Sequence, residues 1–124
     1  LLIIFLLSIG HMASAELNVI TYHDVVADPG DNSYAISRSL FVAHLDYIEK
    51  HGYRVLSLGD LETLYRKRKP IPKKSIMLTF DDGLKSYYEY VAPMLKIYGY
   101  PSVASVVTLG STGLIRRKST RTKL

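Results

Sequence analysis

Two adjacent carboxylates, Asp81 and Asp82, follow an apolar run and precede a glycine, and they are the residues of this sequence best suited to chemistry. Like charges held side by side repel each other unless a cation or a hydrogen-bond network stabilises them. Because neighbouring side chains of an extended backbone point in different directions, one carboxylate can bind a metal ion while the other faces a reacting water. Gly83 lets the backbone turn tightly behind the pair. An Asp-Asp-Gly turn is also a common structural element, so its position in the fold matters.

The chain around this pair alternates between strand-like and helix-like segments. Short apolar, β-branched runs predict strands over residues 17–22, 54–57, 75–80 and 102–108. Helical spacing of apolar residues predicts helices from Ser37 to Gly52, from Asp60 to about Arg66, and from Ser86 to Gly99. In these helices Ser37 and Asp60 are the expected N-caps. Residues 23–36, which contain Pro29 and Gly30, are expected to form a turn-rich loop.

This alternation with short connections predicts an α/β fold with parallel strands and crossover helices. In such folds the chemistry lies in the loops at the C-terminal ends of the strands. Two loops qualify by composition: His23-Asp24 after the first strand and Asp81-Asp82-Gly83 after the third.

The run Thr79-Phe80-Asp81-Asp82-Gly83 resembles the first signature of the polysaccharide deacetylase family. The resemblance extends to Tyr22-His23-Asp24-Val25, to residues 41–58 and to residues 75–101. These segments together look like the N-terminal part of the secreted poly-β-1,6-N-acetylglucosamine N-deacetylases. Their ordered combination is more specific than any single piece.

The resemblance implies a metal-dependent hydrolase, built on a deformed (β/α) barrel, that removes acetyl groups from N-acetylglucosamine units of a β-linked polysaccharide of a biofilm or cell envelope. This chain would supply the N-terminal part of the barrel. By the same resemblance, Asp81 is the general base that deprotonates the attacking water. Asp82 is a ligand of the divalent metal, zinc or cobalt, which polarises the amide carbonyl. In the family, two histidines on a later loop complete the metal site, and a further downstream histidine acts as the acid.

The histidines of this chain depart from that pattern. None follows Asp82, and the four present are His11, His23, His44 and His51. Only His23 lies at the end of a predicted strand, where we expect it to orient neighbours or hydrogen-bond in the core, with direct metal ligation as the alternative. Asp24 is a second possible pocket residue. We therefore expect an incomplete metal site and negligible deacetylation by this chain alone.

The two ends of the chain differ in composition from its middle. Residues 1–9 are uncharged and apolar, and Ala13-Ser14-Ala15 supplies the small residues of a signal-peptidase site. We read residues 1–15 as a signal peptide, which predicts a secreted or periplasmic protein with no transmembrane segment in the mature chain. Residues 16–110 would form a partial deacetylase domain. Residues 111–124 would be a basic tail that is disordered or out of reading frame.

The net charge of +5 and the absence of cysteine limit the other functions. The whole basic excess lies in the tail, in Arg116, Arg117, Lys118, Arg121 and Lys123. Basic runs beside prolines, such as residues 66–69, are usually solvated loops, so no nucleic-acid partner is expected. The lack of cysteine excludes disulfides and thiolate zinc sites.

Two further enzyme or binding functions remain as alternatives to a deacetylase. One is a non-catalytic module that holds glycan on the faces of its tyrosines, Tyr87, Tyr88, Tyr90, Tyr98 and Tyr100. Tyr87 and Tyr98 share the apolar face of the predicted third helix, which favours a place in the core. The other is phosphoryl transfer by an aspartyl nucleophile, for which Asp81-Asp82-Gly83 lacks the usual spacing of one residue between the two aspartates.

Overall fold

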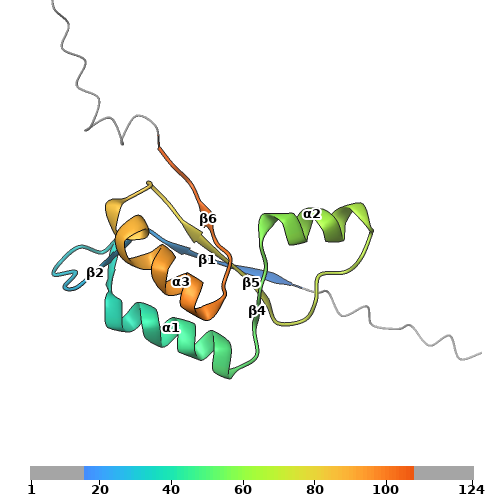
Figure 1. The fold of residues 1–124 in the computed structure, drawn as a ribbon, viewed down its shortest axis with the longest axis horizontal. Helices are drawn as coiled ribbons and strands as arrows, with labels where there is room; N and C mark the ends of the chain where they lie inside the picture. The colour runs from blue at the N-terminus through green and yellow to red at the C-terminus, as the bar shows by residue number, and fades with distance from the viewer. Residues whose placement is uncertain (1–15, 108–124) are drawn as a thin grey trace, which may run out of the picture.

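The computed structural model describes residues 16–107, coloured in Figure 1. Its elements are β1 (Leu17–Tyr22), β2 (Asp24–Val26), β3 (Ala35–Ser37), α1 (Arg38–Lys50), β4 (Arg54–Val55), α2 (Leu58–Arg66), β5 (Ser75–Phe80), the π-helix η1 (Tyr87–Val91), α3 (Ala92–Tyr98) and β6 (Val103–Ala104).

Strand β5 lies at the centre of a four-stranded sheet. Strand β1 pairs with it along its whole length, from Leu17 opposite Ser75 to Tyr22 opposite Phe80. On the other side, β4 pairs with the beginning of β5 and β6 with its end. All three pairings are parallel, which confirms the predicted α/β fold. The strands of the described region form an open sheet, so the barrel stays a prediction.

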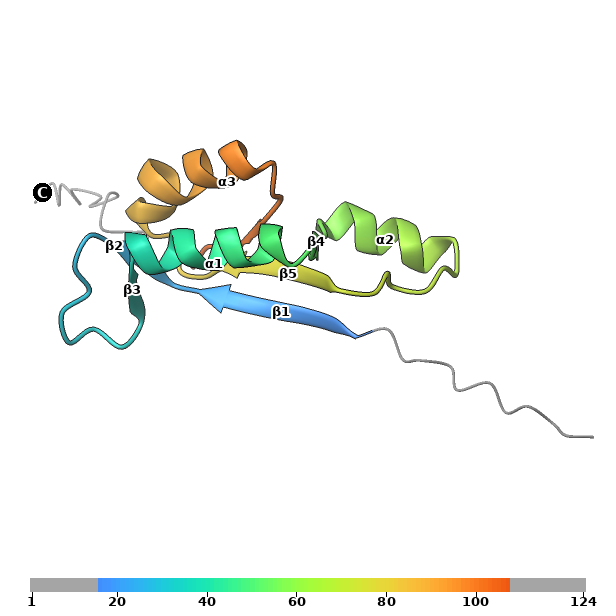
Figure 2. The ribbon, with the colours of Figure 1, turned by 90° about the horizontal axis from the view of Figure 1, so that it is seen from below.

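Helices α1 and α3 cover the same face of the β1–β5 pair, as Figure 2 shows. Alternate residues of β5 face these helices, because successive side chains of a strand point to opposite faces. Ile76, Leu78 and Phe80 accordingly share one core cluster with residues of both helices. Phe41 and Leu45 are the most deeply buried residues of α1 in this cluster, and Leu95 is that of α3.

The ends of the helices follow local hydrogen-bonding chemistry. Ser37 caps α1 as predicted, accepting a hydrogen bond from the Leu40 amide. The prediction that Asp60 caps the second helix is wrong: the N-cap is Ser57, and Asp60 occupies the third helical position. Ser57 and Asp60 form a reciprocal capping box, in which each side chain satisfies a free backbone N–H of the other. Both residue types favour a cap, so composition alone did not separate them.

Three other segments differ from the sequence-based expectation. Residues 23–36 are not a plain loop, because β2 and β3 pair in parallel there. Side chains close this turn, since Asp28 accepts from the Gly30 amide and Asn32 from the Tyr34 amide, each at 3.0 Å. Strands β4 and β6 are only two residues long, much shorter than predicted. The predicted third helix begins as a π-helix, which sequence periodicity does not reveal.

Several predictions from the chain ends lie outside the described residues. They are the signal peptide at 1–15, the tail at 111–124 and the last residues of the predicted 16–110 domain. Within residues 16–107, no helix is both long and apolar enough to cross a bilayer.

Tyr22, the last residue of β1, is packed on several sides. Its side chain is 6% exposed, and its ring stacks on Phe80 with centroids 5.3 Å apart and meets the edge of Phe41 at 5.4 Å. Its hydroxyl shares a 3.0 Å hydrogen bond with Nδ1 of His44. Burial disfavours the phenolate and raises the pKa of Tyr22 from 10.0 to about 12.

This pKa predicts an alkaline loss of stability that involves Tyr22. The unfolded chain releases the tyrosine proton near pH 10, while the folded protein holds it until about pH 12. The Tyr22 contribution is therefore fully present below pH 10 and is lost as the pH rises from about 10 to 12. In urea unfolding across this range, Tyr22→Phe should flatten the decline relative to wild type. Equal declines in the two proteins would contradict the assignment.

Candidate active site

Asp81 is held in place by the strands on both sides of β5. Its backbone N–H donates to the carbonyl oxygen of Tyr22 at 2.9 Å, which continues the β1–β5 ladder beyond the strand. On the opposite side, the carbonyl of Phe80 accepts a hydrogen bond from the Ser105 amide at 2.8 Å. The Asp81 side chain is half-buried. The first carboxylate of the pair therefore stands at the C-terminal end of the central strand, where the α/β pattern predicts chemistry.

The backbone reverses direction at the next two residues. Asp82 has a φ of +70° and Gly83 a φ of +63°, so both adopt the left-handed conformation. This corrects the expectation that both aspartates lie on an extended backbone. A left-handed residue other than glycine is uncommon, although Asp is among the types that tolerate it. Such conformations gather at functional sites, and Asp82 is also exposed to solvent.

His23 and Asp24 follow β1 at the same edge of the sheet. Because Tyr22 pairs with Phe80, the backbone of His23 lies beside that of Asp81. The half-buried ring of His23 packs edge-on against Tyr34, with centroids 5.4 Å apart. Asp24 accepts a 2.5 Å hydrogen bond from the Ser86 hydroxyl. This bond ties the first residue of β2 to the segment after β5, across 62 positions of sequence.

Sequence reasoning did not find Ser86 as a partner of the site. A serine at the start of a helical segment predicts a cap, but it says nothing about a distant carboxylate. No signal in the sequence connects Ser86 to Asp24, and only the fold brings the two together.

The described residues do not by themselves fit a metal site. Within residues 16–107, no group of three or more His, Cys, Asp or Glu side chains is arranged to hold an ion. A zinc site generally needs three protein ligands or more. Asp82 has the right chemistry for one ligand, since carboxylate oxygens bind divalent cations. The remaining ligands are not brought to it by this part of the chain.

Most of the tyrosines proposed as a glycan platform are partly buried at the edge of the core. Tyr87, Tyr90, Tyr98 and Tyr100 pack against the core cluster. Tyr98 also donates a 2.5 Å hydrogen bond to Asp46, and the Tyr87 hydroxyl is 3.0 Å from that of Ser102. Among the five, only Tyr88 is largely exposed, at 82%. Four of the five rings are therefore only partly open to a sugar.

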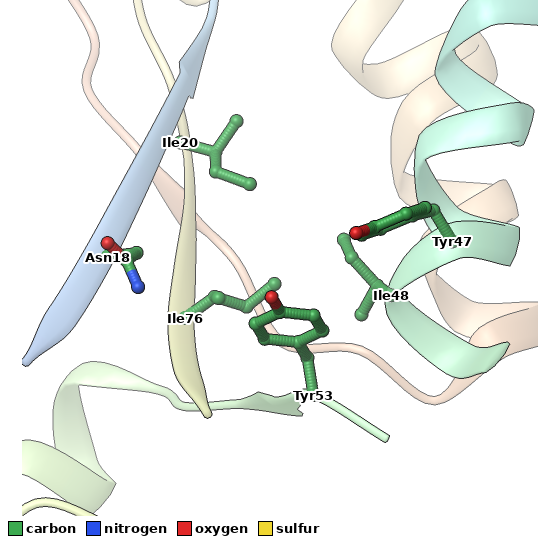
Figure 3. Close-up of a pocket in the computed structure, with 6 residues that line it drawn as sticks. All are labelled: Asn18, Ile20, Tyr47, Ile48, Tyr53 and Ile76. Carbon is green, nitrogen blue, oxygen red and sulfur yellow. The ribbon is translucent and has the colours of Figure 1, made fainter. Parts of the chain in front are cut away.

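A cavity of about 310 Å³ opens between α1 and the strands β1 and β5 (Figure 3). Its lining residues are Asn18, Ile20, Tyr47, Ile48, Tyr53 and Ile76. Asn18 and Ile76 are the second residues of their strands and lie opposite each other. The cavity thus faces the beginnings of the strands, away from the aspartate pair at their ends.

Comparison with known proteins places this geometry in a family. Residues 68–111, which include the aspartate pair, match the family model described as polysaccharide deacetylase. This part of the chain is similar to a polysaccharide deacetylase domain. This confirms the family indicated by Thr79-Phe80-Asp81-Asp82-Gly83, a family of enzymes.

Individual deacetylases agree with the family match. The poly-beta-1,6-N-acetyl-D-glucosamine N-deacetylase of Escherichia coli is 31% identical over 85 residues. That alignment covers 68% of this chain but only 13% of the relative. A de-N-acetylase structure from Aggregatibacter actinomycetemcomitans is 32% identical with a TM-score of 0.66, and IcaB from Ammonifex degensii is 36% identical with a TM-score of 0.63. Each covers 73% of this chain, which spans 37% of either structure.

The turn behind the aspartates requires a glycine at position 83, and a substitution there tests this. A Cβ at this position would lie 3.1 Å from a methyl group of Val106, in addition to the cost of the left-handed backbone. Gly83→Ala should therefore reduce the free energy of unfolding by more than the 1–2 kcal/mol that is roughly typical of the conformation alone. Urea unfolding measures this difference.

Two other glycines provide matched controls. Gly30 has a φ of +51° with open space around it, so Gly30→Ala should show the conformational cost only. Gly59 lies within α2, has no positive φ and has room for a methyl group, so Gly59→Ala should be neutral or stabilising. If Gly83→Ala were tolerated as well as Gly59→Ala, the described turn would be wrong.

Proposed function

We propose that this chain supplies the N-terminal, base-carrying part of a deacetylase that hydrolyses the N-acetyl groups of a β-linked N-acetylglucosamine polysaccharide. The observation that carries the proposal is the aspartate pair, held at the C-terminal end of the central parallel strand by hydrogen bonds to both neighbouring strands. The match to the deacetylase family, and the E. coli relative named for poly-β-1,6-N-acetylglucosamine, support the choice of substrate.

We assign the role of general base to Asp81. In the proposed reaction, water attacks the carbonyl carbon of the acetamido group while a base accepts its proton. The C–N bond then breaks, which gives acetate and the free amine of glucosamine. Hydrogen bonds to both neighbouring strands hold the backbone at Asp81 in place. In the proposed reaction this limits the movement of the carboxylate relative to the reacting water.

Asp82 is proposed as one ligand of a divalent metal. When bound, such a metal polarises the amide carbonyl and favours the attacking water in its deprotonated form. The backbone reverses direction at Asp82. This reversal suits two different tasks for the neighbouring carboxylates. Within residues 16–107, no group of three or more His, Cys, Asp or Glu side chains completes such a site.

The complete fold and the cellular location of the enzyme are also proposals. The parallel sheet with helices on one face is consistent with the N-terminal part of a deformed (β/α) barrel, which residues 16–110 would contribute. The apolar run and the Ala-Ser-Ala motif before residue 16 support a signal peptide, and hence a secreted or periplasmic enzyme of the cell envelope.

A chimera tests the proposed function directly. The aligned segment of the E. coli relative is replaced by the corresponding residues of this chain, and acetate release from β-1,6-linked N-acetylglucosamine oligomers is measured. The chimera should deacetylate, and Asp81→Asn within it should lower the rate by roughly 100-fold or more, the usual contribution of a general base. Asp28→Asn, a change of another loop carboxylate, should leave the rate unchanged. A folded but inactive chimera, or an active Asp81→Asn variant, would contradict the proposal.

A second experiment examines the chain by itself. Because the described residues hold too few metal ligands, the purified chain should release acetate at close to the background rate with added zinc or cobalt. The E. coli relative serves as the positive control on the same oligomers. Turnover comparable to that of the relative would show that the site is complete after all.

A further inference from the structure

A cavity of about 340 Å³ lies between β2, the start of α1 and the helical segment after β5, apart from the aspartate pair. Its lining residues are Asp24, Val25, Val26, Ala27, Arg38, Leu84, Lys85, Ser86 and Glu89. The volume falls at the lower end of the range for small-ligand sites, about 300–1,000 Å³. The deacetylation proposed above uses none of these side chains for its chemistry.

The polar walls of this cavity are held in place by contacts of their own. The Ser86 hydroxyl donates to Asp24 at 2.5 Å, and Lys85 pairs with Glu89 at 2.7 Å. The guanidinium of Arg38 stands over the ring of Tyr90, 4.6 Å from its centroid. Groups that are already oriented lose less entropy when a ligand binds. The Asp24–Ser86 hydrogen bond and the Arg38–Tyr90 contact therefore orient part of the cavity wall before any ligand arrives.

The charges that line the cavity balance. Asp24 and Glu89 supply two negative charges, and Arg38 and Lys85 supply two positive charges. A phosphate or polyanion site would show an excess of positive charge. Charged side chains of both signs, with donors and acceptors close together, suit a neutral ligand with many hydroxyl groups. The side chain of Ala27 and the 37% exposed Leu84 add an apolar surface that an acetyl methyl group can contact.

The helix beside the cavity has an unusual form at this point. Glu89 lies within the π-helix Tyr87–Val91, and Ser86 directly precedes it. π-Helical turns are rare and frequently occur at functional sites, because they are less favourable than the α-helix that could replace them. Glu89 and Ser86 both line the cavity, so the π-helix forms part of its wall.

We infer that this cavity is a binding subsite for a neutral N-acetylhexosamine unit of the polysaccharide, next to the unit that reacts at Asp81. The identity of the polymer rests on the proposed function. The position follows from the chain: Asp24 comes directly after His23, whose backbone lies beside Asp81, and Leu84 is two residues beyond Asp82. A polysaccharide that crosses the ends of the strands can reach both places.

Chemical-shift titration of the ¹⁵N-labelled chain tests the inference. The probes are β-linked N-acetylglucosamine oligomers and the same oligomers fully deacetylated. The acetylated oligomer should give saturable shifts at the amides of Val26, Ala27 and Lys85, and it should bind more tightly than the cationic, deacetylated one. Glu89→Gln should weaken binding by about tenfold, the effect of one lost hydrogen bond to a charged group.

Glu62→Gln is the matched control. Glu62 pairs with Arg66 at 2.6 Å and four positions apart on α2, as Lys85 pairs with Glu89, and their carboxylates are similarly exposed, at 60% and 51%. This control should bind as wild type does. Equal affinity in Glu89→Gln and Glu62→Gln, or tighter binding of the deacetylated oligomer, would overturn the inference.

The pattern of shifts separates this inference from the proposed function. Shifts at residues 81–83 with none at the cavity would overturn the subsite and leave the deacetylase proposal intact. Shifts at the cavity together with an inactive chimera would support the sugar subsite and contradict the proposed function. If neither the cavity nor residues 81–83 showed shifts at saturating oligomer, the subsite would be overturned. The chimera would still decide the function.

Discussion

The peptide that joins Phe80 to Asp81 is hydrogen-bonded to a parallel strand on each side, and the candidate active site depends on this arrangement. The N–H of Asp81 reaches β1, and the carbonyl of Phe80 accepts from Ser105 just beyond β6. Each bond contributes only about 1 kcal/mol to stability, but together they fix the direction in which β5 ends. A carboxylate placed one residue beyond a strand held in this way has little freedom in its backbone.

The hydrophobic core also holds the end of β5 in place. The ring of Phe80 packs against Tyr22 and Phe41, so the end of β5 is anchored to β1 and α1 by side chains as well as by the ladder. The less favourable conformations follow immediately after this anchored end. Asp82 and Gly83 are left-handed, and a π-helix begins at Tyr87. Strained segments of this kind persist only where surrounding structure determines them, and here the sheet and the core do so.

The sequence predicted the elements whose signals are local. The apolar run at residues 75–80, the Ser37 cap and the glycine after α3 each specify structure through neighbours in the chain, and each was confirmed. The predictions failed where two residues compete for one role, as Ser57 and Asp60 do at α2. They also failed where distant segments decide, as in the pairing of β2 with β3 and the bond from Ser86 to Asp24. The left-handed Asp82 belongs to the same group, because Val106 packs behind its turn.

The central claim is that the Asp81 backbone is fixed by β1, and amide hydrogen exchange of the full chain tests it most directly. If the Asp81 N–H donates to Tyr22 as described, it should exchange slowly, with protection comparable to that of Thr79, two residues earlier on the same edge of β5. The amide of Ser105 should also be protected, because it donates to Phe80. If Asp81 exchanged at the rate of an unprotected amide while Thr79 stayed protected, the aspartate pair would lie on a loose loop, and the account of the site would be wrong.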